Sequence, residues 1–239
     1  MNQADSGSRI HGRLLPAGVA GDESVRGNGG DSVVEPGNNE HPDQRIVRKP
    51  SEAVARLPSG QHLVQDFPVL DLGLQPLVST GTWRLAISGK VDVPTVWGWT
   101  TFLSQPQVTL RSDIHCVTAW SRYDNEWQGV TARHLLSVVR PLSSARFVLF
   151  CSFDGYTSNV PLTAFADDDV LLAHSWQGRP LTREHGGPVR VIIPKLYFWK
   201  SAKWVREILF LDEDSPGYWE VRGYHNNGNP WLEERYARR

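Results

Sequence analysis

Residues 108–116 read Val-Thr-Leu-Arg-Ser-Asp-Ile-His-Cys. Apolar and polar side chains alternate along this stretch, which is typical of a half-buried β-strand. Val108, Leu110 and Ile114 share one face of the expected strand, and Cys116 falls on the same face by parity. The stretch therefore predicts a strand that ends with a thiol on its buried face.

Other stretches carry similar patterns. Residues 82–89 alternate and end on a glycine, and the segments 94–104 and 131–139 have helical character, each with a proline shortly after it. Apolar runs typical of buried strands cover residues 146–151, 170–174, 189–193 and 205–211. Strands and helices do not alternate regularly, so we expect an α+β fold with a strand-rich, mixed core.

Aromatic residues divide the chain into two parts. All 10 Trp, 6 Tyr and 8 Phe lie at or after Phe67, whereas many of the 21 Gly lie in the first 60 residues. A segment without large apolar side chains cannot offset the entropy of ordering its backbone. We predict a mostly disordered N-terminal extension over residues 1–61 and one globular domain over residues 62–239.

The charge balance is close to neutral, with 25 Lys+Arg against 26 Asp+Glu. This balance argues against nucleic acid or a membrane surface as a partner. No run reaches the roughly 18 apolar residues of a membrane span, and no apolar leader segment is found near position 1. The cytoplasm is therefore the expected location.

Cys116 is the first candidate for chemistry. A lone cysteine is often only a small buried apolar group, and this interpretation fits Cys151 within its apolar run. His115, Arg111 and Arg122 are close to Cys116 in sequence, and cations favour the thiolate. One thiolate cannot form a zinc site or a disulfide alone, but it can bind a metal whose other ligands come from an organic cofactor.

A second candidate is the segment 185–206. Its cations are Arg190, Lys195, Lys200, Lys203 and Arg206, with no acidic residue between them. Gly186 and Gly187 allow close approach of backbones, and the turn at Ser201, Ala202 and Lys203 can offer N–H groups and an ammonium to a phosphate. A solvated basic stripe is the alternative. Because the cations alternate with apolar residues, we favour a phosphorylated ligand.

A third candidate is the stretch 152–159, Ser-Phe-Asp-Gly-Tyr-Thr-Ser-Asn, directly after an expected strand. Functional residues favour loops at strand ends, although an ordinary Asp-Gly turn is the alternative. The sequence lacks GxGxxG, P-loop, HExxH, CxxC, CxxCH and GxSxG motifs. Common nucleotide, zinc, covalent-haem and serine-hydrolase sites are therefore not expected.

Four segments in order resemble the sulfite-oxidase-like molybdopterin oxidoreductases, in particular the small stand-alone bacterial members. They are residues 113–121 (Asp-Ile-His-Cys-Val-Thr-Ala-Trp-Ser), 154–159, 185–204, and the tail at 216–220 and 223–226. The resemblance covers residues 64–236. It implies the strand-rich molybdopterin-binding fold of that family, in a single domain.

The resemblance also implies a mononuclear molybdenum bound by a single pterin. Cys116 would be its protein ligand, and Tyr156 corresponds to the family's active-site tyrosine. The residues that would contact the pterin or its phosphate are Ser152, Asp154, His185, Arg190, Ser201, Ala202 and Lys203. Sulfite oxidases place an arginine in a turn after their cysteine to bind the anion. Here Arg122 is the candidate for that role from a shifted position, and His115 is a further catalytic candidate.

The function implied is two-electron oxygen-atom transfer on a small-molecule substrate, with electrons exchanged with a separate partner. Either a small oxyanion or an S- or N-oxide fits. The dimerisation domain and fused haem domain of larger family members are missing from this sequence, which weakens the case for sulfite. A non-catalytic molybdopterin carrier or sensor is the first alternative, and an unrelated structural or interaction domain is the second.

Overall fold

The computed structural model describes residues 56–237, so the predicted extension lies outside the described residues except for positions 56–61. Arg56 forms ion pairs with Asp113 and Asp124 at N–O distances of 2.6 and 2.9 Å. Gln61 donates a hydrogen bond to the carbonyl oxygen of Cys116 at 3.1 Å. Residues 56–61 therefore make direct contacts with the globular domain.

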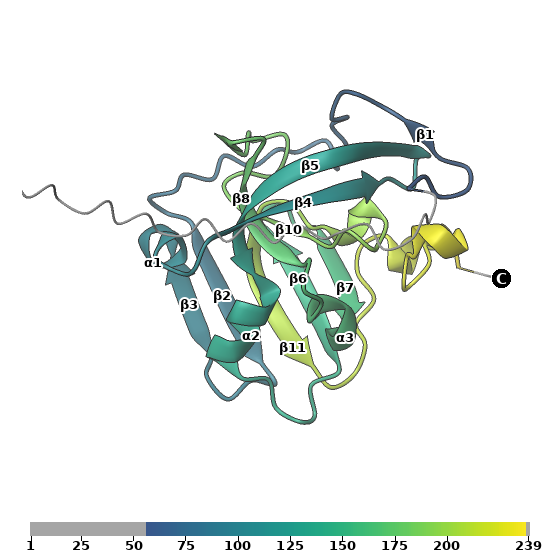
Figure 1. Ribbon diagram of the computed structural model, residues 1–239. Coiled ribbons are helices and arrows are strands. Elements are labelled where there is room, and N and C mark those ends of the chain that lie inside the picture. The colour runs from purple at the N-terminus through teal and green to yellow at the C-terminus, as the bar shows by residue number, and fades with distance from the viewer. Residues whose placement is uncertain (1–55, 238–239) are drawn as a thin grey trace, which may run out of the picture. The chain divides into compact units, whose positions relative to one another are not determined.

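Two β-sheets form the framework of the described chain (Figure 1). The five-stranded sheet has the order β3-β2-β11-β6-β7, and β11 runs parallel to β2 and antiparallel to β6. Its strands are β2 (Arg84–Gly89), β3 (Thr95–Gly98), β6 (Phe147–Ser152), β7 (Thr157–Pro161) and β11 (Val205–Leu211). The mixed pairing confirms the predicted α+β fold with a strand-rich, mixed core.

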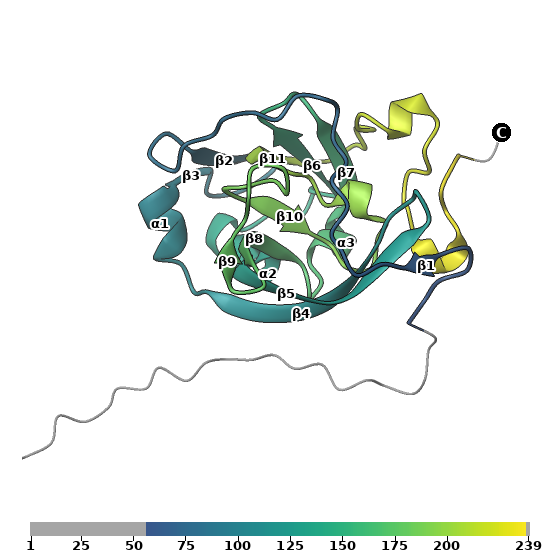
Figure 2. The same cartoon turned by 90° about the horizontal axis from the view of Figure 1, so that it is seen from above.

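The six-stranded sheet has the order β1-β5-β8-β10, with β4 beside β5 and β9 beside β8. Its strands are β1 (His62–Leu63), β4 (Val108–His115), β5 (Trp120–Thr131), β8 (Leu171–Trp176), β9 (Arg179–Pro180) and β10 (Arg190–Ile192). Seen from above, the long strands β4 and β5 curve together along one side of the domain (Figure 2). Their hairpin presents Cys116 in the turn between them.

Short helices lie between the strands and in the tail after β11. They are α1 (Trp99–Leu103), α2 (Ala132–Val139), α3 (Leu162–Phe165) and the 3₁₀ turns η1 (Phe198–Lys200), η2 (Glu220–Arg222) and η3 (Pro230–Leu232). Helix α2 begins where the Thr131 hydroxyl accepts a hydrogen bond from the His134 N–H at 3.1 Å. It ends at Arg140, whose φ of 51° is left-handed. Leu135 and Val139 bury its apolar face.

The expected strand at 108–116 is confirmed as β4, and the expected helix at 131–139 as α2. The segment 94–104 is helical only in its second half, because β3 occupies Thr95–Gly98. β5 consists mostly of polar residues, a composition that does not favour a strand. It is a strand because β4 and β8 pair with its two edges. Gly129 permits this approach, since a Cβ there would lie 2.0 Å from the Leu172 oxygen.

The core has two apolar clusters. The larger one contains Trp83, Phe102 and Phe150 with residues from both sheets and α2. The smaller one contains Leu110, Ile114 and Cys116 from the β4 end of the six-stranded sheet. The predicted common face of these three residues is thus confirmed. Within residues 56–237, no helix has both the length and the apolar character needed to cross a membrane.

Candidate active site

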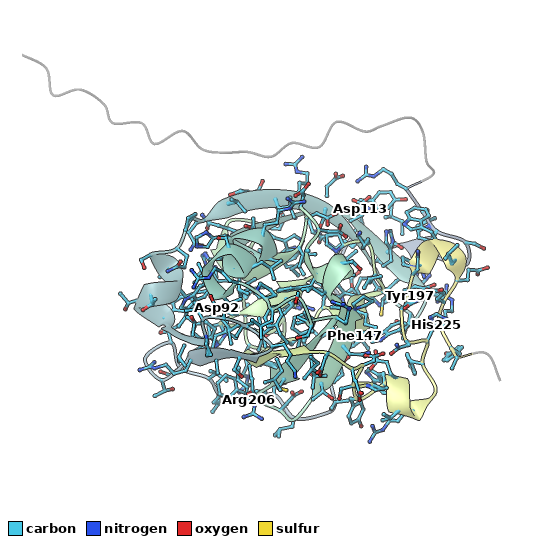
Figure 3. All side chains as sticks on the ribbon, turned by 90° about the horizontal axis from the view of Figure 1, so that it is seen from below. Asp92, Asp113, Phe147, Tyr197, Arg206 and His225 are labelled. Carbon is cyan, nitrogen blue, oxygen red and sulfur yellow. The ribbon has the colours of Figure 1, made fainter. Side chains whose placement is uncertain are left out.

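A cavity of about 350 Å³ opens beside the β4–β5 turn. Its walls come from segments that are far apart in the sequence. They are residues 67–72, residues 116–118 with Trp120, Asp154 and Tyr156, residues 184–204 in part, and Trp219 and Tyr224 of the C-terminal tail. The tail packs beside the loop before η1, where Tyr197 and His225 lie on the same side of the domain (Figure 3).

Cys116, in the turn after β4, lines this cavity. The Cys116 N–H donates to the Trp120 oxygen at 2.8 Å, and the Ala119 N–H donates to the Cys116 oxygen at 3.1 Å. Ala119 has a left-handed φ of 73°, which closes the turn. The Thr118 hydroxyl donates to the Cys116 Sγ at 3.1 Å. The sulfur is therefore held in place while it lines the cavity.

Burial raises the pKa of the Cys116 thiol above its ordinary value. The Thr118 hydroxyl, the backbone N–H groups of Thr118 and Val117, and the charge of Arg235 act in the opposite direction and favour the thiolate. Because a metal binds the thiolate and not the thiol, metal binding at Cys116 would release a proton. These groups, which belong to the turn and the tail, are suited to assist that release.

The cations that flank Cys116 in sequence do not surround its sulfur, so the expectation of local positive charge from them is wrong. Arg111 is exposed and pairs with Glu126 at 3.7 Å. Burial lowers the pKa of His115 to about 4, so its ring is neutral at pH 7. Strand β5 carries Arg122 away from the turn, where it donates to Asn125 Oδ1 at 2.5 Å.

Sequence-distant residues hold the turn instead. Arg235 donates from Nη1 to the Val117 oxygen at 2.5 Å, across 118 positions of the chain. Gln61 donates to the Cys116 oxygen and accepts from the Ser121 hydroxyl at 3.2 Å. No local motif marks Arg235 or Gln61, because their role depends on tertiary contacts alone.

Arg190 forms a cationic end of the cavity. It is 2% exposed, and its Nη1 and Nη2 atoms donate to the oxygens of His185 and Ser201, each at 2.9 Å. Its Nε atom is buried without a hydrogen-bond partner. Among residues 56–237 no carboxylate forms a salt bridge with it, and burial lowers its pKa to about 9. A buried guanidinium of this kind favours an anionic ligand.

Lys203 adds a second cation at this end. Its Nζ donates to the Glu184 oxygen at 2.8 Å and lies 3.9 Å from Asp71 Oδ2. Burial, followed by the charge of Arg190, lowers its pKa to about 8. Gly186 allows the two backbone segments to meet here, since a Cβ at its φ of 100° would lie 2.9 Å from the Lys203 side chain. Ser201 and Ala202 complete this part of the wall.

Aromatic side chains make up much of the remaining wall. The His185 ring stacks on Phe67 with centroids 4.0 Å apart, and burial followed by the charge of Arg190 lowers the pKa of His185 to about 4. The Tyr156 hydroxyl donates to the Trp199 oxygen at 2.6 Å. Burial raises the pKa of Tyr156 well above its ordinary value, so this hydroxyl stays protonated. Asp154 accepts from the Tyr156 N–H at 3.0 Å.

A metal carried by an organic cofactor would be held by the side chains that line this cavity. Within the described part of the chain, no three His, Cys, Asp or Glu side chains converge on one point. A metal at Cys116 would therefore need ligands supplied by the cofactor itself. The buried Arg190 Nε atom and the nearby Lys203 ammonium provide donors for a phosphate. The residues present thus fit a phosphorylated cofactor that carries a metal.

Residues 72–219 match the oxidoreductase molybdopterin binding domain family. The chain belongs to this family. The predicted family and enzyme class are thereby confirmed. The cavity of this chain brings a buried cysteine, Cys116, together with a buried arginine, Arg190.

This molybdopterin oxidoreductase is similar in sequence to two bacterial oxidoreductases. It is 42% identical over 188 residues to the uncharacterized oxidoreductase YuiH of Bacillus subtilis, covering 78% of this chain and 95% of YuiH. It is 27% identical over 172 residues to the protein-methionine-sulfoxide reductase catalytic subunit MsrP of Ralstonia nicotianae, covering 63% of this chain. The match spans 52% of MsrP, about half of that protein's length.

A solved structure supports the fold of this molybdopterin oxidoreductase. The sulfane dehydrogenase SoxCD of Paracoccus pantotrophus aligns with a TM-score of 0.54 and 23% identity. The alignment covers 58% of this chain and 40% of that chain. The sulfite-oxidase-like fold, predicted from four sequence segments, is therefore confirmed.

The cavity of this molybdopterin oxidoreductase gathers most of the predicted site residues. Those that line it are Cys116, Asp154, Tyr156, His185, Arg190, Ser201, Ala202 and Lys203. Ser152, Arg122 and His115 are not among its lining residues. The Ser152 hydroxyl is buried without a partner at the end of β6, and the His115 ring bonds to Ser121 behind the turn at 2.8 Å.

Proposed function

We propose that this chain is a molybdenum enzyme that transfers an oxygen atom in a two-electron reaction, with Cys116 as the protein ligand of the metal. The placement of the Cys116 sulfur in a cavity that also has a buried cationic end carries the proposal. The bound cofactor would supply the redox and oxygen-transfer chemistry. The chain would bind that cofactor, position the substrate and exclude water.

One pterin is proposed, because the lining offers one group of cations. Within residues 56–237, Arg190 and Lys203 are the cations of the lining, and they act on each other electrostatically. Such a pair suits a single phosphate, which would draw further contacts from Ser201 and Ala202. His185 and Phe67, stacked face to face, would provide a flat surface for the pterin ring.

The charges of the lining favour a neutral S-oxide or N-oxide over an oxyanion as substrate. The lining also contains three acidic residues, Asp71, Asp154 and Glu184, whose negative charges offset the positive charges of Arg190 and Lys203. Once those two cations bind a phosphate, no further cation among the described lining residues remains for a second anion. Arg122, the predicted anion-binding arginine, is not among the lining residues. Its guanidinium carbon lies over the Trp176 ring, 4.8 Å from the ring centroid. The relative MsrP is named a protein-methionine-sulfoxide reductase, and a methionine sulfoxide side chain is a neutral S-oxide, which is consistent with this substrate class.

The test uses protein purified from cells supplied with molybdate. Elemental analysis should find about one molybdenum per chain, the number that a single site can bind. Reduced viologen should be oxidised by methionine sulfoxide, dimethyl sulfoxide or trimethylamine N-oxide, and sulfite with ferricyanide should react poorly. Absence of molybdenum would refute the enzyme, and turnover of sulfite alone would refute the substrate class. Molybdenum without turnover in either direction would support the carrier or sensor alternative.

Lys203→Ala should lower cofactor retention by roughly tenfold, the lower end of effects for groups that support a metal site. The ammonium lies at the cationic end, and its loss leaves Arg190 as the cation nearest to the phosphate. Molybdenum content after gel filtration is the measurement, and Lys203→Arg, which keeps the charge, is the control. Equal metal content in Lys203→Ala and the unaltered protein would remove Lys203 from the phosphate site.

A pH effect follows from the same lysine in cofactor-free protein. The folded-state pKa of Lys203 is about 8, below the ordinary 10.5. Between these values the unfolded chain binds a proton that the folded chain does not, so the free energy of unfolding should rise with pH in this window. The expected gain from pH 8 to pH 10, by urea unfolding, is about 1–2 kcal/mol more than in Lys203→Ala. An equal rise in the free energy of unfolding of the unaltered protein and Lys203→Ala would contradict the lowered pKa of Lys203.

A separate electron-transfer partner and a cytoplasmic location stay predictions. Fractionation of cells that express a tagged chain would test the location. Co-purification from the fraction that contains the chain, followed by reduction of the metal with the captured protein, would test the partner.

A further inference from the structure

The Thr118 hydroxyl makes direct contact with the sulfur that would bind the metal. Its Oγ1 atom donates to Cys116 Sγ at 3.1 Å, and both residues line the cavity. A donor–sulfur distance this short lies well inside the range of hydrogen bonds to sulfur. The hydroxyl thus acts on the lone pairs that a thiolate would share with a metal.

The turn has enough other hydrogen bonds to keep its shape without this hydroxyl. The Cys116 and Ala119 N–H groups bond within the turn. Gln61 holds the Cys116 oxygen, and Arg235 holds the Val117 oxygen. Thr118 itself is exposed at this surface, so its side chain contributes little to core packing. A purely architectural role therefore leaves the direction of the hydroxyl, toward Sγ, unexplained.

Hydrogen bonds to a ligand sulfur change the properties of the metal that it binds. The donor withdraws electron density from the sulfur, which makes the thiolate a weaker donor to the metal. The reduced, more electron-rich metal is then stabilised relative to the oxidised one, so the reduction potential rises. A hydrogen-bond donor to the ligand sulfur therefore sets part of the driving force for two-electron transfer, through the reduction potential of the metal.

We propose that Thr118 is a positioning residue that fixes Cys116 Sγ toward the metal and raises the reduction potential of the metal through its hydrogen bond. The inference rests on the proposed function, because it needs a metal at Cys116. It extends that function by naming a residue that tunes the site from within the cysteine turn.

The experiment compares the metal-loaded Thr118→Val, Thr118→Ser and unaltered enzymes. Valine has the shape of threonine and lacks the hydroxyl, whereas serine keeps the hydroxyl. Potentiometric titration followed by the paramagnetic resonance of the half-reduced metal should give a lower reduction potential in Thr118→Val. The potential of Thr118→Ser should match that of the unaltered enzyme. Equal potentials in all three proteins would overturn the proposal.

Metal content separates the possible failures. Unaltered protein without molybdenum would refute the proposed function, whereas loaded proteins with equal potentials would refute only the role of Thr118. Thr118→Ala provides a second hydroxyl-free variant in case the valine variant does not fold. Loss of molybdenum from both hydroxyl-free variants, with full loading of Thr118→Ser, would support the fixing of Sγ by this hydroxyl.

Discussion

Cys116→Ser is expected to reduce turnover with S-oxides by at least about 1,000-fold. Loss of a residue that only hydrogen-bonds to a metal ligand costs roughly 10–100-fold, and loss of the ligand itself should cost more. A serine hydroxyl stays protonated near neutral pH and is a poor ligand for a metal that favours soft sulfur. The fold should persist, because the turn is held by backbone hydrogen bonds that do not involve the sulfur. Oxidation of reduced viologen, molybdenum content and thermal unfolding are the measurements.

Cys151→Ser is the matched control for this variant. Cys151 is also buried, with 8% exposure against 6% for Cys116, but it lies in β6 and does not line the cavity. Both substitutions place a hydroxyl where a thiol was, so both should cost similar folding free energy, about 1–2 kcal/mol. Only Cys116→Ser should lose turnover. Normal activity in Cys116→Ser, or an equal loss in Cys151→Ser, would refute Cys116 as the metal ligand.

The parts of the site that the sequence predicted share a local origin. Alternation along β4 places Cys116 on the face of Leu110 and Ile114, and this rule needs only neighbouring residues. The same holds for Arg190 and Lys203, whose positions between apolar residues imply burial with a partner. Four matched segments then supplied the family, which periodicity alone does not provide.

The parts that could not be predicted depend on contacts between distant segments. β5 is a strand because β4 and β8 pair with it, although its polar composition favours a loop. The cation near Cys116 is Arg235 from the tail, whereas Arg122 is only six positions away in sequence and is turned elsewhere. Proximity in sequence is a poor guide at a turn, because the chain reverses and each following residue moves away.

The C-terminal tail offers the largest expected effect on stability. Lys200 and Glu220 form an ion pair with an N–O distance of 2.6 Å, and their side chains are 0% and 2% exposed. Lys200 also donates to the Asn159 oxygen at 2.8 Å, and the Trp199 indole donates to Glu220 at 2.8 Å. This pair joins η2 of the tail to η1, whose Trp199 lines the cavity.

Glu220→Gln should lower the free energy of unfolding by about 3–5 kcal/mol, because it leaves the Lys200 charge buried without its counter-charge. Urea unfolding of the cofactor-free protein is the measurement. Asp92→Asn is the control, since it breaks an ion pair with Arg140 at the same 2.6 Å but with side chains more than half exposed. That variant should lose about 1 kcal/mol or less.

The double variant Lys200→Met with Glu220→Gln separates the loss of attraction from the cost of an unpaired charge. Removing both charges should be less destabilising than Glu220→Gln alone, since no buried ammonium then remains. If Glu220→Gln were no more harmful than Asp92→Asn, water would have to reach Lys200, and the tail could not be a fixed wall of the cavity. If the double variant is as stable as the unaltered protein, the loss of stability in Glu220→Gln comes from the buried, unpaired charge of Lys200 and not from lost packing.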